Sequence, residues 1–135
     1  MARLETLTLL FLLSNTMTTG IVLFAHGSRD PQWRLPIEAV AQQISERSPS
    51  AMVRCAYLEL CLPSLPDAAT DLIAAGAQKI KVFPIFLGVG KHAREDLPLL
   101  IEDIRTAHPQ ITVELMRTAG ENEALISLMA DLALA

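Results

Sequence analysis

Residues 21–30 read IVLFAHGSRD, and this stretch decides the fold class. Its first half, residues 21–25, is a continuous apolar run with β-branched members, which is typical of a strand buried on both faces of a sheet. Gly20 and Gly27 bound the run. Its second half, residues 26–30, changes abruptly to small and ionisable side chains. A buried strand that ends in such a loop predicts an α/β domain with a ligand site at the carboxyl end of the strand.

Short apolar runs and segments with helical spacing alternate along the rest of the chain. The expected strands are 21–25, 52–60, 79–87 and 111–116, and the expected helices are about 33–47, 65–73, 97–104 and 125–132. Because strand and helix alternate four times, the strands are expected to be parallel, with right-handed crossovers and helices on both faces. The pattern predicts a three-layer αβα sandwich with a four-stranded parallel sheet in the flavodoxin-like order 2-1-3-4. Its ligand cleft is expected between strands 1 and 3.

The chain of 135 residues fits a single domain, which we place at 17–135. Residues 1–16 are interpreted as a dispensable N-terminal extension, because Met17 stands directly before the first strand. Their apolar run, 7–13, is far shorter than the ~20 residues of a membrane span, and its flanks suit a signal peptide poorly. No membrane partner is therefore expected.

Charge and cysteine content narrow the class of protein further. The net charge of −4 argues against a nucleic-acid-binding domain, which usually carries a basic surface. Cys55 and Cys61 are six residues apart and form no Cys-x-x-Cys pair, so they are interpreted as ordinary reduced thiols. These features together favour a cytoplasmic protein.

Two histidine-containing segments follow the strands that should be neighbours at the switch point. His26 comes directly after strand 1, and His92 follows strand 3. Imidazole binds Co²⁺, Fe²⁺, Ni²⁺ and Zn²⁺ and can accept a proton near neutral pH, so both are candidate metal ligands and catalytic bases. Glu59, at the C-terminal end of strand 2, is a candidate third ligand or proton acceptor. Candidate substrate-binding residues in the same segments are Ser28, Arg29, Gly90, Lys91 and Arg94.

Each assignment has a structural alternative. A lone loop histidine usually makes one structural hydrogen bond, Glu59 could be an exposed strand-end carboxylate, and each basic residue could belong to a solvated surface. His108 precedes a proline at a helix C-terminus, where a cation interacts favourably with the helix dipole, and is interpreted as structural.

Three familiar motifs are absent. The run 88–92, GVGKH, is not a P-loop, because its glycines are too close and His92 replaces the Ser or Thr that would hold Mg²⁺. No Gly-x-Gly-x-x-Gly follows strand 1, which disfavours a dinucleotide fold. Ser28 lacks the frame of a nucleophile elbow.

Several spaced motifs resemble one family. They are HGSR at 26–29, Leu58-Glu59 with Pro63, PIFL at 84–87 continuing to GKH at 90–92, and DLP at 96–98. Over residues 20–132 the chain resembles the short form of the CbiX-type sirohydrochlorin cobaltochelatases, together with the related ferrochelatases and nickelochelatases.

The resemblance implies a metal chelatase with a chelatase-like half-domain. It places metal binding and proton removal on His26 and His92, and an acidic role on Glu59. It implies that a divalent metal, Co²⁺ or alternatively Fe²⁺ or Ni²⁺, is inserted into sirohydrochlorin or a precorrin-2-type ring that carries eight carboxylates. Short members associate as homodimers, need no ATP and hold no permanently bound cofactor.

Two other functions remain open at this stage. A tetrapyrrole or metal carrier would bind the ring without accelerating metal insertion. A phosphate-handling α/β enzyme could use His26 as its nucleophile, but this alternative leaves His92 without a role.

Overall fold

The computed structural model describes residues 17–135 of the chain, so the expected extension at 1–16 lies outside the described residues. The four strands are β1 (Thr19–Ala25), β2 (Met52–Tyr57), β3 (Lys79–Pro84) and β4 (Thr112–Leu115). All pair in parallel, in the order β2-β1-β3-β4. The predicted strand order and fold class are confirmed.

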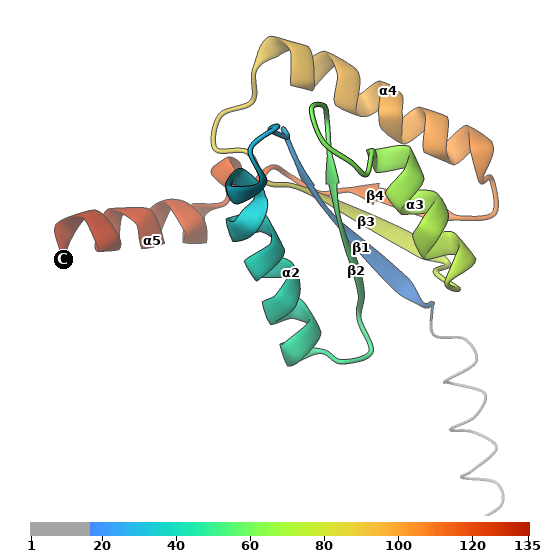
Figure 1. Cartoon of the computed structure of the whole chain (residues 1–135), viewed down its shortest axis with the longest axis horizontal. Helices are drawn as coiled ribbons and strands as arrows, with labels where there is room; N and C mark the ends of the chain where they lie inside the picture. The colour runs from blue at the N-terminus through green and yellow to red at the C-terminus, as the bar shows by residue number, and fades with distance from the viewer. Residues whose placement is uncertain (1–16) are drawn as a thin grey trace, which may run out of the picture.

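Helical segments follow each strand of the sheet. They are η1 (Pro31–Arg34), α2 (Leu35–Arg47), α3 (Leu65–Ala74), α4 (Lys91–Ala107), η2 (Ala119–Glu121) and α5 (Glu123–Leu134). Figure 1 shows α2 against one face of the sheet and α3 and α4 against the other, while α5 extends away from the sheet. The expected helix at 125–132 is therefore present, but it does not cover the sheet.

The hydrophobic core lies between the sheet and the layer formed by α3 and α4. Alternate side chains of β3, Ile80 and Val82, are fully buried there against Leu72 of α3 and Ile101 of α4. The other residues of β3, such as Phe83, face the α2 side and are only partly buried. The sheet is thus well covered on one face and half covered on the other.

Two predicted strands end earlier than expected. The pattern predicted a strand over 52–60, but β2 ends at Tyr57 because the chain turns at Leu60, whose φ of 69° lies in the left-handed region. The strand expected over 79–87 ends at Pro84. The loops that carry candidate site residues therefore begin earlier than expected, directly after Tyr57 and Pro84.

The third helix begins earlier than expected. Apolar spacing marked residues 97–104, whereas α4 begins at Lys91 and ends at Ala107. Its first turn contains exposed polar side chains around the small buried residue Ala93, so a clear apolar periodicity begins only at Leu97. His92, expected in a loop, therefore lies in the first turn of α4.

Candidate active site

The loops after β1 and β2 are joined at the carboxyl edge of the sheet. The backbone N–H of Leu58 donates to the Ala25 carbonyl at 2.9 Å, and that of Glu59 donates to the His26 carbonyl at 3.0 Å. Gly27, between these contacts, has a φ of 104°, and a Cβ at this position would collide with the Glu59 carbonyl oxygen. A glycine is therefore required where the two loops meet.

This junction brings His26 and Glu59 together. His26 Nε2 lies 2.8 Å from Glu59 Oε1, and the two side chains are about half exposed, at 49% and 47%. A neutral imidazole that donates its Nε2–H to the carboxylate keeps the lone pair of Nδ1 free. Glu59 thus orients the ring, as carboxylates do beside metal-binding histidines.

A second histidine–carboxylate pair stands at the start of α4. His92 Nε2 lies 2.9 Å from Asp96 Oδ2, one helical turn away, with 72% of the histidine side chain exposed. Asp96 was not among the predicted site residues. Its relation to His92 follows from i,i+4 spacing once the helix is known to begin at Lys91. Both candidate histidines therefore engage a carboxylate through the same ring nitrogen.

The two pairs do not form a closed metal cage. Within residues 17–135, no group of three or more His, Cys, Asp or Glu side chains is arranged to hold a metal ion. The chain brings His26 to Glu59 and His92 to Asp96, but it does not assemble His26, Glu59 and His92 into one cluster.

The predicted substrate-binding residues surround these pairs. Ser28 Oγ accepts a hydrogen bond from the Asp30 N–H at 3.1 Å and so shapes the loop after β1. Gly90 is the N-cap residue of α4, and Lys91 Nζ lies 4.0 Å from Glu95 Oε1. In the described part of the chain, Arg29 and Arg94 are exposed and form no ion pair. Both guanidinium groups are available to an acidic ligand.

Two ionisable side chains beside the site are poor proton acceptors. Burial, together with the nearby Cys55 and Glu38, raises the pKa of Tyr57 to about 12. Burial also raises the pKa of the Cys55 thiol, whose Sγ lies 3.9 Å from the Ile37 carbonyl oxygen. Both groups are therefore protonated near neutral pH.

Apolar side chains at the same edge were missed by the sequence analysis. Leu60 and Leu62 in the loop after β2 are 50% and 80% exposed, and Leu87 in the loop after β3 is 67% exposed. Trp33 in η1 is 38% exposed and packs edge-on against Tyr57, with ring centroids 6.2 Å apart. The sequence signal for these residues was the presence of leucines in segments expected to be loops. Exposed apolar side chains of this kind often mark a binding surface.

Several known proteins with similar sequences are named as sirohydrochlorin chelatases. The chain is 32% identical to a sirohydrochlorin cobaltochelatase of Methanococcoides burtonii, over 84% of this chain and 89% of that protein. It is 30% identical to the chloroplastic sirohydrochlorin ferrochelatase of Arabidopsis thaliana, over 83% of this chain and 50% of that protein. The match to the sirohydrochlorin cobaltochelatase of Methanopyrus kandleri covers 61% of this chain and 57% of that protein, at 35% identity.

Solved structures with the same fold include a CbiX protein from Marinobacter aquaeolei VT8, assigned to cobalamin (vitamin B12) biosynthesis. It is 33% identical, with a TM-score of 0.74 over 86% of this chain and 94% of that chain. The cobalt complex of the sirohydrochlorin chelatase SirB from Bacillus subtilis subspecies spizizenii is 25% identical, with a TM-score of 0.70. That match covers 87% of this chain but 52% of SirB.

A family model also matches the chain, and the match covers nearly all of the described residues. The CbiX model matches residues 20–134, which include β1, both histidine–carboxylate pairs and α5. The sequence match, the strand order and the solved relatives thus agree, and the chain belongs to the CbiX family.

Proposed function

We propose that this protein inserts a divalent metal, in the first place Co²⁺, into sirohydrochlorin. The observation that carries the proposal is the presence of two histidine–carboxylate pairs at one edge of the sheet, at 2.8 Å and 2.9 Å. The names of its relatives support this chemistry, since they include sirohydrochlorin cobaltochelatases and a sirohydrochlorin ferrochelatase. The bound cobalt in SirB supports cobalt as a metal that this fold can hold.

The number of histidine–carboxylate pairs equals the number of protons that the reaction releases. Insertion of M²⁺ into the ring forms four metal–nitrogen bonds and releases two pyrrole protons. In the proposal, His26 and His92 each present Nδ1 to the metal or to a proton, while Glu59 and Asp96 hold the opposite ring nitrogen. A site with few protein ligands hands its metal on readily, because the ring nitrogens replace the remaining ligands one by one.

The side chains around the pairs suit both parts of the substrate. Arg29, Lys91 and Arg94 are exposed cations that can bind peripheral carboxylates, with the two arginines able to bind in bidentate fashion. The exposed Leu60, Leu62 and Leu87 offer apolar contact to the flat face of the macrocycle. The metal is a substrate in this scheme, and no resident cofactor is invoked.

A homodimer is part of the proposal. This chain corresponds to about half of SirB, which supports the idea that a second copy supplies the other wall of the cleft. Light scattering at micromolar concentration is expected to give twice the chain mass of 14.7 kDa. A monomer that metallates at full rate at the same concentration would contradict this part.

A cytoplasmic location is also proposed, because Cys55 and Cys61 are free thiols, as expected in a reducing compartment. Within residues 17–135, no helix is long and apolar enough to cross a membrane. Cell fractionation is expected to place the activity in the cytoplasmic fraction, and activity confined to an extracellular or membrane fraction would contradict it.

The direct experiment is anaerobic metallation of sirohydrochlorin with Co²⁺, Fe²⁺ or Ni²⁺, followed by the absorbance spectrum of the ring. We expect the protein to accelerate insertion well above the protein-free rate, with Co²⁺ the fastest. Binding is measured separately through Trp33, the single tryptophan, whose fluorescence the bound ring should quench. Quenching without any acceleration would identify a carrier instead of a chelatase.

A further inference from the structure

Helix α5 is apolar on nearly all sides and is not covered by the rest of the chain. Its sequence, EALISLMADLAL, has only Glu123, Ser127 and Asp131 as polar residues, and none of its residues is buried. The exposed fractions of Leu132 and Leu134 are 67% and 85%, and Ile126 is half exposed. Figure 1 shows the helix projecting from the body of the domain. A helix of this composition is stable in water only when another apolar surface covers it.

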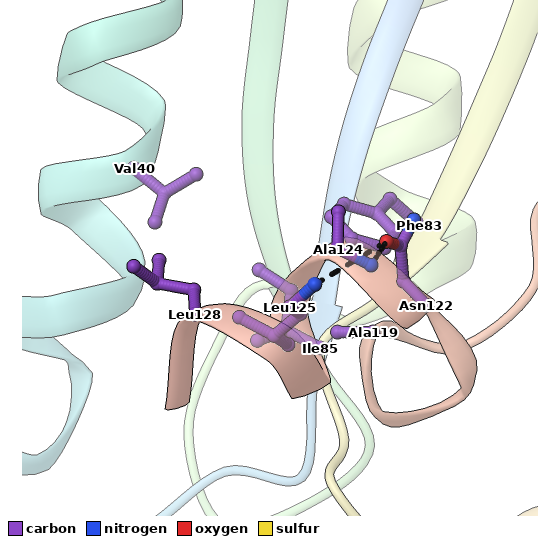
Figure 2. Close-up of a pocket in the computed structure, with 8 residues that line it drawn as sticks. All are labelled: Val40, Phe83, Ile85, Ala119, Asn122, Ala124, Leu125 and Leu128. Carbon is purple, nitrogen blue, oxygen red and sulfur yellow. Dashed lines mark hydrogen bonds between the residues drawn. The ribbon is translucent and has the colours of Figure 1, made fainter. Parts of the chain in front are cut away.

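An apolar groove lies beside this helix on the α2 face of the sheet. Figure 2 shows its wall formed by Val40 of α2 on one side and by Leu125 and Leu128 of α5 on the other, with Phe83 and Ile85 at its base. The cavity measures about 420 Å³. Asn122, the polar residue among its lining, is occupied, because its Oδ1 accepts from the Ala124 N–H at 2.9 Å and caps α5.

The base of α5 is anchored, which fixes the helix as a wall of the groove. The Gly120 N–H donates to the Phe86 carbonyl at 2.8 Å, and a Cβ at Gly120 would collide with the Leu87 carbonyl. Because α5 begins three residues later and lines the groove with its own first turns, it cannot also fill the groove. The occupant has to come from another molecule or another segment.

We propose that the occupant is α5 of a second copy, so that each copy places its helix in the groove of its partner. Such an exchange is self-complementary and closes a two-fold dimer. The charges match as well, because α5 carries two acidic residues and no basic one. Lys81 lies on the same face of β3 as Phe83 and forms no ion pair among the described residues. Asp131 of one copy can therefore approach Lys81 of the other.

This inference rests on the proposed homodimer and specifies its contact surface. It also links that surface to the site, because the Gly120–Leu87 contact joins the base of α5 to the loop that leads to His92. The residues that line the groove are apolar apart from Asn122, so the groove suits an apolar helix better than the carboxylate-rich edge of sirohydrochlorin.

The test replaces exposed apolar residues by glutamate and measures mass by light scattering or sedimentation. Leu132→Glu and Ile126→Glu should raise the Kd of the dimer by about 100-fold or more, since each symmetric interface contains the change twice. Leu99→Glu on α4 is the matched control, because Leu99 is 64% exposed and lies far from α5 in sequence and on the opposite layer. This variant should remain a dimer, and far-UV circular dichroism should confirm that all three are folded.

A charge reversal tests the pairing of the two copies more specifically. Asp131→Lys should weaken the dimer, and addition of Lys81→Glu should restore it. Dimers that persist in Leu132→Glu and Ile126→Glu would overturn the docking of α5 while leaving the chelatase and the homodimer intact. A monomeric unmodified chain that metallates sirohydrochlorin would overturn docking and homodimer together, but not the activity. Loss of the dimer on removal of residues 1–16 alone would assign the groove to that segment and overturn the proposal.

Discussion

At the scale of single residues, the chemistry depends on which nitrogen of each histidine is engaged. Glu59 and Asp96 both bind Nε2, so each imidazole is oriented with Nδ1 open. The histidines and Glu59 were predicted from their positions after strands. Asp96 was not, because its relation to His92 depends on a helix whose polar first turn gives no periodic signal.

Loss of a carboxylate partner should lower the metallation rate measurably, but less than loss of a histidine. Glu59→Gln and Asp96→Asn are each expected to lower the metallation rate by about 10–100-fold, since loss of a carboxylate behind a metal-binding histidine typically has that cost. Glu102→Gln is the control, because Glu102 lies on the same helix as Asp96 but pairs with Arg105 at 2.7 Å. Full activity in both Glu59→Gln and Asp96→Asn would show that neither carboxylate contributes to metallation.

Tyr57 should titrate far above the ordinary range of a tyrosine. It is the single tyrosine of the chain, so alkaline titration of tyrosinate absorbance reports it alone. Because burial stabilises the neutral phenol, the apparent pKa should be about 12 in the folded protein and about 10 after denaturation. Folding stability linked to this group is full below about pH 10 and is lost as pH rises towards 12. An apparent pKa near 10 in the native protein would show that Tyr57 is solvated.

At the scale of elements, the order of strands and helices was predicted correctly and their boundaries less well. Alternating apolar patterns identify strands because burial is periodic, but the end of β2 depends on contacts with the loop after β1. Leu58 and Leu60 continue the apolar pattern while the backbone already turns. The apolar stripe of α5 likewise predicts a helix without showing what covers it.

The junction of the loops after β1 and β2 should tolerate no side chain at Gly27. Gly27→Ala combines a positive φ with a collision against the Glu59 carbonyl, so we expect a loss of about 1–3 kcal/mol and a Tm lower by several degrees. The shift of His26 relative to Glu59 should also reduce metallation. Gly88→Ala is the control, because a Cβ there meets open space, and its stability should change by no more than about 0.5 kcal/mol. Equal melting temperatures for the two variants would contradict this description of the junction.

At the scale of the whole molecule, the two faces of the sheet are covered unequally. Its well-covered face, packed by α3 and α4, supplies the stability of the domain. Its half-covered face, with α2 and the unpacked α5, is where we expect the second copy. The strand order and the family could be predicted from sequence, because both depend on local patterns and spaced motifs. The exposed surface of α5 could not, because it depends on how the helix leaves the domain.

The most direct test of the central claim is the initial rate of anaerobic Co²⁺ insertion into sirohydrochlorin by His26→Ala and His92→Ala. Each variant should lose about 10²–10⁴-fold in rate, and the double variant should be little worse than the poorer single one, since the residues act as a unit. Quenching of Trp33 should show that the ring still binds, and His108→Ala, which alters the histidine at the far end of α4, should retain the full rate. Near-normal metallation by both single variants at saturating metal would contradict the account.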